Sequence, residues 1–555
     1  MKTFKFTIII ALCSVIIYGC SKKSATFPHL VAVPENAAIV LSFNAKQIVE
    51  KAELNKIEQY RFYSLLEQEF DRLPAKSSKI VKDFVKDTRT SGLNLDNIFV
   101  YISNGNTDTD EYPLFYFGIT VKIENLKTFE NFLGNNDLIP SQIEDRFIDL
   151  REGITVQWND EIVVISMNAV ENGIDIFNKD ESKSILANEL FKSEYSDKND
   201  AYLYMEYNFI IDFLQNVSAY YALDQTTLSN IDLYKDMSIS ASLNSEKGEL
   251  VAKGKMLPAE KVSELVGKFY KTDFNPELYN YFPDKSLLAV KFAIKPLDIY
   301  NYYKKTIGIG QTEETAETTT EKVETLDEYG NVIDEEDVVI DKYSGYTHSY
   351  NLLLKMFVEQ HDEKITSILE SFTGDFIGSM LGFSNFPMPE FAVATGIVEG
   401  KENAVINLIK ELKFTENSDG YYSLNINNMH LYFAVNKNAA CLATNTELIA
   451  KFLDKGYTSN ITSAKDMGKE IKDALNYFYL NININDYPPL LKVLTGMSEQ
   501  GRVFLPLLEK LKSISGRSAN ANDFELKLKF TDNDYASKII LKGIDELAAE
   551  NLILQ

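Results

Sequence analysis

Cysteine is scarce in this chain of 555 residues, which contains three: Cys13, Cys20 and Cys441. Two of them fall in the first twenty residues, so we expect no disulfide in the body of the protein and a fold held together by burial alone. The four histidines are not at metal-ligand spacing, and no Cys-x-x-Cys or His-Glu-x-x-His motif is present. The sequence therefore points to no metal and no cofactor.

Basic residues are also few. The chain has 56 Lys and Arg against 81 Asp and Glu, which gives a formal net charge of -25. This balance argues against nucleic acid as a partner, because binding to nucleic acid depends on contacts of Lys and Arg with phosphate. It argues equally against a protein that spreads over anionic lipid headgroups.

Long apolar runs are missing after residue 20, so no later segment approaches the roughly 18 apolar residues of a membrane-spanning helix. The one apolar run, residues 6–17, follows two lysines and ends in Tyr18-Gly19-Cys20. A basic start, a short apolar run and a small residue before the cut are typical of a secretory signal. The ending resembles the bacterial lipoprotein box, whose cysteine is diacylated. We therefore predict a lipoprotein signal peptide at residues 1–19 and a palmitate-type lipid on Cys20; the alternative is an ordinary signal with a chance cysteine.

A polar segment, Ser21-Lys22-Lys23-Ser24, follows the predicted lipidation site. We assign residues 20–32, including His29, to a lipidated tether that holds the body close to a membrane. Position 21 lacks the aspartate that retains some lipoproteins at the inner membrane, and the segment lacks the acidic residues of a surface-export signal. We expect a cell-envelope protein, lipid-anchored at the outer membrane, with its body in the periplasm.

Aromatic residues are abundant, with 34 Phe and 31 Tyr in a chain that is 45% hydrophobic. This composition supplies large cores and excludes a disordered protein. Tyrosine clusters such as Tyr220-Tyr221, Tyr302-Tyr303 and Tyr421-Tyr422 fit an interface or a sugar-binding groove, but tyrosine is also a common strand residue. We favour a place in core and sheet for them.

The strongest internal pattern is a duplication. Residues 34–43 match residues 283–292 at an offset of 249, whereas residues 202–205 match residues 477–480 at an offset of 275. An insertion in the second copy explains the difference. Residues 311–341 carry twelve acidic side chains and a single basic one, so we expect a mobile acidic loop there.

The register of the copies divides the chain into a first lobe at residues 33–273 and a second lobe at residues 281–548. Apolar alternation predicts strands and hairpins, and periodic segments between them predict helices. The predicted strands are residues 38–43, 114–121, 154–158, 162–167, 202–207, 238–243 and 250–256, and the predicted helices are residues 46–54, 126–133 and 210–214, with a further helix opened by Pro258. We therefore expect an α+β fold of two tandem duplicated lobes, each of mainly antiparallel sheet with helices packed on one face.

The residues that carry chemistry form no catalytic constellation. His361 lies in a charged helix and His430 on a strand, and both are read as structural. Cys441 occupies an aliphatic strand position and is read as a small buried hydrophobic residue, with a nucleophile as the weaker alternative. No catalytic, cofactor-binding or metal-ligating residue is assigned.

One glycine pattern and two acidic segments are interpreted as structural. Gly374, Gly378 and Gly382 are spaced for helix packing, but their counterpart in the first copy is rich in strand formers, which favours a strand or bulge. Residues 106–110 begin like a calcium loop without its required glycine and final glutamate, so a turn is preferred. Residues 334–337 are read as part of the acidic loop.

The start of the body resembles a known family. The residues that carry the resemblance are Phe27-Pro28-His29, then Val33-Pro34-Glu35-Asn36-Ala37-Ala38-Ile39-Val40, and the Thr373-Gly374-Asp375 step in the second copy. They are similar to a family of large, uncharacterised Bacteroidota lipoproteins. The resemblance covers nearly the whole mature chain. That family is known as a domain of unknown function, so it supplies no catalytic residue.

Three functions remain open. The first is a membrane-anchored, non-catalytic protein that binds or scaffolds an envelope protein through a surface shared by both lobes. The second is a carboxylate-dependent hydrolase of envelope polymers or glycans, which needs a buried pair of carboxylates in one cleft. The third is a carrier of an apolar ligand, which needs an apolar cavity. We favour the first, because the anchor and the duplication support it.

Overall fold

The structure is a computed structural model of the chain. The residues that it describes are 28–72, 78, 82, 91–104, 115–135, 146–149, 154–167, 181–211, 234–258, 260–306, 319–326, 332–340, 346–385, 388–426, 429–454, 456–520 and 522–549. The predicted signal peptide, Cys20, the calcium-like residues 106–110 and the tyrosines at 220 and 221 lie outside these residues.

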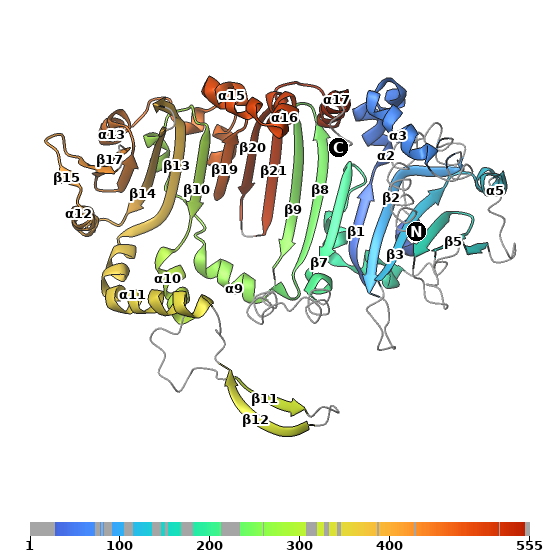
Figure 1. The fold of residues 1–555 in the computed structure, drawn as a ribbon, viewed down its shortest axis with the longest axis horizontal. Helices are drawn as coiled ribbons and strands as arrows, with labels where there is room; N and C mark the ends of the chain where they lie inside the picture. The colour runs from blue at the N-terminus through green and yellow to red at the C-terminus, as the bar shows by residue number, and fades with distance from the viewer. Residues whose placement is uncertain are drawn as a thin grey trace.

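Nineteen strands join into one continuous antiparallel sheet, which runs across the whole molecule in Figure 1. The pairings place the strands in the order β4-β5-β6-β3-β2-β1-β7-β8-β9-β21-β20-β19-β10-β13-β14-β18-β17-β16-β15. Their bounds are β1 (Ala37–Phe43), β2 (Leu93–Asn104), β3 (Phe115–Ile123), β4 (Phe147–Asp149), β5 (Ile154–Trp158), β6 (Ile162–Met167), β7 (Ala201–Glu206), β8 (Ser238–Glu246), β9 (Glu249–Leu257), β10 (Leu288–Ala293), β13 (Phe372–Asn385), β14 (Met388–Ile397), β15 (Thr415–Glu416), β16 (Tyr422–Ile426), β17 (Met429–Val435), β18 (Ala439–Ala443), β19 (Asn476–Asn481), β20 (Leu511–Ser518) and β21 (Asp523–Phe530).

Local sequence chemistry explains why many elements form where they do. In the hairpin of β5 and β6, the side chain of Asn159 accepts hydrogen bonds from the backbone N–H groups of Glu161 and Ile162, which stabilises the turn. Both strands have the predicted bounds. The prediction of strands at residues 38–43, 114–121 and 238–256 and of helices at residues 46–54 and 126–133 is also confirmed within a few residues.

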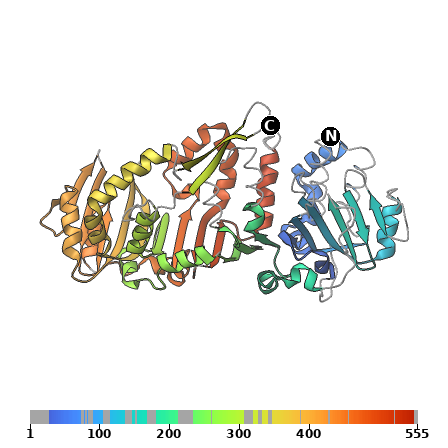
Figure 2. The same ribbon diagram turned by 90° about the horizontal axis from the view of Figure 1, so that it is seen from below.

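Helices cover both faces of the sheet, as Figure 2 shows. Their bounds are η2 (Pro28–Ala32), α2 (Ala45–Ala52), η3 (Leu54–Gln59), α3 (Arg61–Asp71), α5 (Leu126–Asn135), η7 (Ile185–Ala187), α6 (Glu189–Glu194), α9 (Glu260–Phe269), η9 (Pro276–Tyr281), α10 (Pro296–Thr306), α11 (Tyr346–Leu369), α12 (Glu402–Glu411), α13 (Thr446–Leu453), η11 (Ile461–Ser463), α14 (Gly468–Asp473), α15 (Pro489–Met497), α16 (Glu499–Lys510) and α17 (Ala536–Ala549). Pro258 precedes α9 by two residues instead of opening it.

The prediction that helices pack on one face is wrong. On one face, Tyr477 and Tyr479 of β19 are buried in a cluster with residues of α13 and α14. On the other face, Leu528 of β21 packs against Ile539 of α17. The reason is that apolar side chains lie on both faces: Tyr477 and Tyr479 of β19 on one face, and Leu528 and Phe530 of β21 in the cluster with α17 on the other.

The two halves of the chain meet at the β9–β21 pair. Val251 pairs with Lys527 at the middle of this junction, Lys253 with Glu525 on one side and Glu249 with Lys529 on the other. Outward from the junction lie nine strands of the first half and ten of the second. The halves therefore share one sheet, in addition to the chain segment that connects them between residues 273 and 281.

Helices cross the junction in both directions. The C-terminal helix α17 packs against α2 and α3 of the first half, and α9 of the first half packs against α10 of the second. Asp545 of α17 accepts hydrogen bonds from the backbone N–H groups of Arg61 and Phe62 at the start of α3. Each half therefore stabilises a helix of the other.

Two predicted segments have a different structure from the one expected. Residues 28–32, assigned to the tether, form η2, in which His29 and Leu30 are buried. Leu30 of this segment belongs to the same core cluster as Val40 of β1, so residues 28–32 are part of the folded body. In the acidic insertion, β11 (Thr319–Leu326) and β12 (Val332–Ile340) pair as a separate two-stranded hairpin, which includes residues 334–337 and lies away from the main sheet in Figure 1. The alternating Val, Thr and Glu residues of both strands favour this pairing.

Candidate functional site

An apolar row crosses the middle of the sheet on the face of Leu526. It runs through eight adjacent strands as Val393, Gly378, Val290, Phe478, Gly516, Leu526, Ala252 and Leu243. The glycines bring the large side chains into contact, because a β-carbon at Gly516 would lie 2.1 Å from the Phe478 ring and 2.8 Å from the Leu526 side chain. The row belongs to both halves of the chain and spans roughly 34 Å at about 4.8 Å per strand.

The large side chains of this row are exposed although their strands are interior. Val393 is 39% exposed, Phe478 38%, Leu526 43% and Leu243 39%, and Phe292 on the same face is 44% exposed. A side chain between paired strands becomes this accessible only where no helix covers it. Exposed apolar surfaces of this kind are frequent at interaction sites of soluble proteins.

Helix α15 shows a second apolar surface. Leu490, Val493, Leu494 and Met497 recur at the spacing of one helix face, and they are 50%, 58%, 48% and 71% exposed. Phe504 of the adjacent helix α16 is 51% exposed. The apolar side of α15 therefore faces solvent, which is the reverse of a normal surface helix. We call Leu490, Val493, Leu494 and Met497 the α15 stripe.

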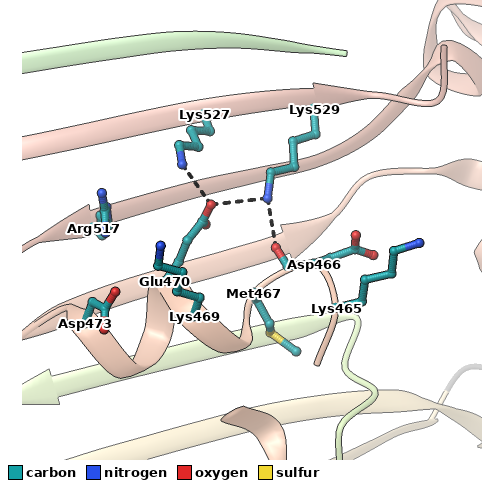
Figure 3. Close-up of a pocket in the computed structure, with 9 residues that line it drawn as sticks. All are labelled: Lys465, Asp466, Met467, Lys469, Glu470, Asp473, Arg517, Lys527 and Lys529. Atoms are coloured by element: carbon teal, nitrogen blue, oxygen red, sulfur yellow. Dashed lines mark hydrogen bonds and ion pairs between the residues drawn. The ribbon is translucent and has the colours of Figure 1, made fainter. Parts of the chain in front are cut away.

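The opposite face of the sheet carries a charged pocket of about 290 Å³ beside the same junction, shown in Figure 3. Its lining residues are Lys465, Asp466, Met467, Lys469, Glu470, Asp473, Arg517, Lys527 and Lys529. Glu470 of α14 points at β21, where its carboxylate lies 3.0 Å from the Lys527 ammonium and 3.2 Å from that of Lys529. Lys529 also donates a hydrogen bond to the backbone carbonyl of Asp466.

The electrostatics of this network keep its carboxylates ionised. Burial raises the pKa of Glu525, but hydrogen bonds from Arg517 and Lys527 outweigh burial and lower the pKa to about 2. Burial likewise opposes ionisation of Glu470, and the bonds from Lys527 and Lys529 still hold its pKa below the ordinary value. Both glutamates are therefore anions at neutral pH, and they link Arg517, Lys527 and Lys529 into one chain of charges.

A buried lysine lies next to this network, in a second pocket of about 440 Å³. Lys291 of β10 is 1% exposed, and its ammonium donates hydrogen bonds to the Tyr279 hydroxyl at 2.6 Å and to the Ile471 and Ala474 carbonyls. It also lies 4.5 Å from the centre of the Phe274 ring. Burial lowers the pKa of Lys291 to about 8. The geometry is that of a positive charge that caps the C-terminal end of α14.

The candidates named from the sequence are spread over the fold. Cys441 lies in β18 and is 1% exposed, which confirms a buried strand residue, and burial raises the pKa of its thiol to about 12. His430 is exposed on β17 and His361 is half-buried in α11 beside Phe357. Glu124 is exposed at a bend, and Glu402 is half-buried at the start of α12. None of these residues lines either pocket.

The glycine and tyrosine interpretations have clear outcomes. Gly374, Gly378 and Gly382 all lie in β13, which confirms the strand, and Gly374 has a φ of 86° where the strand bends against Ile294. Among the predicted tyrosine clusters, Tyr422 is buried in β16, which fits core and sheet, whereas Tyr303 lies in α10 and is 38% exposed. In the ranges that the structure describes, no three His, Cys, Asp or Glu side chains gather where a metal ion could bind.

Sequence reasoning missed Lys291, the charged pocket and the apolar row. Lys291 could have been noticed as a lysine within an apolar strand segment. The matching segment, residues 34–43, has Ser42 at that position. The pocket combines side chains from α14, β20 and β21, and no spacing in the sequence connects them. The row was hidden because apolar alternation looks the same whether or not a helix covers it.

Among the described residues, no helix is long and apolar enough to cross a membrane. Two solved structures of TP0453 match part of the fold. Crystal form I has 12% sequence identity and a TM-score of 0.21 over 45% of this chain and 90% of that one. Crystal form IV has 14% identity and a TM-score of 0.20 over 41% and 79%. No curated protein matches the chain significantly. A family model matches residues 31–537, so the chain belongs to the family described as a domain of unknown function, DUF4836.

Proposed function

We propose that this protein is a lipid-anchored, non-catalytic binding protein of the bacterial cell envelope, and that it binds a partner protein through the apolar row. The observation that carries the proposal is the exposure of Leu243, Leu526, Phe478 and Val393 in the middle of a sheet. These side chains come from strands of both halves, so the binding surface is shared by the whole molecule.

The shape of the row favours a protein over a small apolar ligand. Pockets for small molecules are concave and bury most of the ligand surface. The row is instead long and continuous across eight strands, and it is apolar throughout, as the buried core of a protein interface is largely apolar. The described pockets, of about 290 and 440 Å³, are lined largely by polar and charged residues.

The proposed duplication accounts for a surface of this size. Equivalent strands of the two halves add to one sheet through the β9–β21 pair. The short bridges Pro34–Ser184 and Pro283–Asn460 are equivalent in the two copies, which supports a common origin of the halves. We infer that the protein arose by tandem duplication and that joining the copies doubled the length of the apolar surface.

The anchor is the second part of the proposal. The sequence places a lipid on Cys20, eight positions before the first described residue, Pro28. Such a link reaches roughly 16 Å as a flexible coil, so the body stays near the membrane. We assign this membrane to the outer membrane of a member of the Bacteroidota and the body to the periplasm. The α15 stripe adds a further apolar surface on the body.

A pair of matched variants tests the binding surface. Leu526→Asn with Phe478→Ser places polar groups in the row, and Leu412→Asn changes an apolar residue elsewhere that is 53% exposed. A partner cross-linked in native envelopes should be retained by the wild type and by Leu412→Asn and lost from the double variant. Retention by all three proteins, with unchanged folding by circular dichroism, would refute the proposed surface.

A second experiment tests the anchor. Mass spectrometry of the N-terminal peptide should find a diacylated Cys20, and Cys20→Ser should move the protein from the membrane fraction to the soluble fraction. An unmodified thiol at Cys20 in the mature protein would refute the lipoprotein assignment. It would not bear on the proposed binding surface, which the first experiment tests.

A further inference from the structure

The charged pocket of Figure 3 has more positive than negative side chains. Five cationic residues and three carboxylates line it, in a protein whose net charge is -25. Adding Lys253, Lys512 and Glu525, which bond to the same network, raises the surplus from two positive charges to three. Lysines and arginines are thus concentrated here against the overall charge of the chain.

The floor of the pocket is formed by β20 and β21. Its cationic side chains form ion pairs with only two glutamates. Glu525 lies 2.8 Å from Arg517, 3.1 Å from Lys527 and 3.3 Å from Lys253. Glu470 forms ion pairs with both Lys527 and Lys529. Four cations therefore share two carboxylates, so each retains donor capacity that these anions do not satisfy.

The charges on the floor are largely buried and balance one another, whereas the lysines of the wall are exposed. The side chains of Lys527, Lys529 and Glu470 are 17%, 19% and 14% exposed, and Glu525 is 9% exposed. Partly buried charges interact more strongly than charges in water. Lys465 and Lys469 add two exposed ammonium groups to the lining, and neither forms an ion pair with a carboxylate among the described residues.

We propose that this pocket binds an anion with two or more oxygen atoms, a phosphate group, held by Lys527 and Lys529 on the floor and by Lys465 and Lys469 on the wall. A phosphate oxygen accepts the ammonium protons that Glu470 leaves unsatisfied, and a doubly charged phosphate offsets most of the surplus positive charge. The phosphate belongs either to a soluble phosphate ester or to a lipid headgroup, since both present the same oxygens.

Inorganic phosphate is the probe for the first test. Titration calorimetry at constant ionic strength should give saturable binding to the full-length mature protein. Lys465→Gln with Lys469→Gln should weaken it without unfolding the protein, because neither lysine has an ion-pair partner in the described structure. Lys527→Gln should weaken it by about tenfold or more, as loss of one charge-assisted hydrogen bond does.

The control removes one positive charge outside the pocket. Lys437 is an exposed lysine in the turn between β17 and β18, and Lys437→Gln should bind phosphate as the wild type does. A general stabilising effect of phosphate on folded proteins would act equally on all variants. Absence of binding to the wild type, or equal binding by the control and the pocket variants, would overturn the proposal.

A second arm distinguishes the source of the phosphate. The mature protein without its lipid is mixed with vesicles of phosphatidylglycerol, and with vesicles of phosphatidylcholine as the uncharged comparison. Sedimentation with phosphatidylglycerol that is lost in Lys465→Gln with Lys469→Gln and is displaced by inorganic phosphate assigns a headgroup. Binding of free phosphate without sedimentation assigns a soluble phosphate ester.

Discussion

At the scale of single residues, burial decides what the few unusual side chains can do. Cys441 is the single described cysteine, and its thiol lies among alanines and aliphatic residues of β14, β17 and β18. Since burial raises the pKa of this thiol to about 12, the thiolate is absent at neutral pH. A residue that appears reactive in the sequence is therefore part of the core.

The first prediction concerns this thiol. Native protein at pH 7.5 should not react with an aromatic disulfide reagent over hours, and it should react fully and rapidly in guanidinium chloride. The unfolded sample is the control, because it has the same single core thiol. Labelling of Cys441 in native protein at a rate near that of a free thiol would contradict the burial described here.

Lys291 differs from Cys441, because its ammonium group is charged although it is buried in the core. Its ammonium holds the Ile471 and Ala474 carbonyls and the Tyr279 hydroxyl, and removing it takes a donor from each of these groups, although the Ile471 carbonyl keeps the hydrogen bond from the Tyr279 hydroxyl. We expect Lys291→Met to lower the free energy of unfolding by about 2–4 kcal/mol at pH 7, from the loss of a buried charge-assisted network. Denaturant unfolding followed by circular dichroism measures this change.

The pH dependence of the same variant gives a third prediction. Burial lowers the pKa of Lys291 to about 8 in the folded protein, whereas an unperturbed lysine has a pKa of 10.5. Between these two pH values the unfolded chain therefore binds more protons than the folded protein. The stability that the wild type draws from this residue therefore rises as the pH increases from about 8 towards 10. The difference between wild type and Lys291→Met should widen over this range. If the difference in unfolding free energy stays constant or becomes smaller over this pH range, the pKa of Lys291 is not lowered in the folded protein.

At the scale of elements, helix α17 makes the first half depend on the C-terminal end of the chain. Asp545 caps the first turn of α3, and Lys538 forms ion pairs with Glu53 and Asp534. Leu541 also packs against the α2–α3 cluster. These contacts join segments that are more than 480 positions apart in the sequence.

The fourth prediction tests this long-range cap. Asp545→Ala should destabilise the protein by about 1 kcal/mol, the usual effect of losing an N-terminal cap, and it should speed hydrogen exchange at Arg61 and Phe62. Asp545→Asn keeps an acceptor oxygen and should retain most of the protection. Unchanged exchange in α3 after Asp545→Ala would mean that α17 does not cap this helix.

The acidic insertion is an element of a different kind. Strands β11 and β12 pair with each other and with no strand of the main sheet among the described residues. The fifth prediction is that replacing residues 311–341 by a short Gly-Ser linker leaves the unfolding temperature of the body unchanged, because little buried area is lost. A loss of more than about 5 °C, or roughly 1 kcal/mol, would show that the hairpin supports the fold.

At the scale of the whole molecule, the single sheet explains both candidate surfaces. Joining the halves through β9 and β21 creates interior strands with two long faces. Helices cover the ends of one face and leave the row around Leu526 exposed, whereas the other face holds the network of Glu470 and Glu525. Both surfaces therefore arise from the same junction.

Much of the local structure was predictable, because it depends on neighbours in the chain. Alternation in residues 154–167 determines a hairpin, and Asn159 stabilises its turn. The charged pocket was not predictable in the same way, since Glu470 and Lys527 meet only through the pairing of β19, β20 and β21. The exposed row depends on which strands receive a helix, and that is a property of the complete fold.

By itself the sequence determined the type and bounds of most strands and the burial of Cys441, because each follows from local apolar periodicity. Only the tertiary structure decided that the two halves form one sheet, that η2 belongs to the body, that Lys291 is buried and which apolar face stays open. These features rest on contacts between residues that are hundreds of positions apart, and the energy of such contacts is absent from any local pattern.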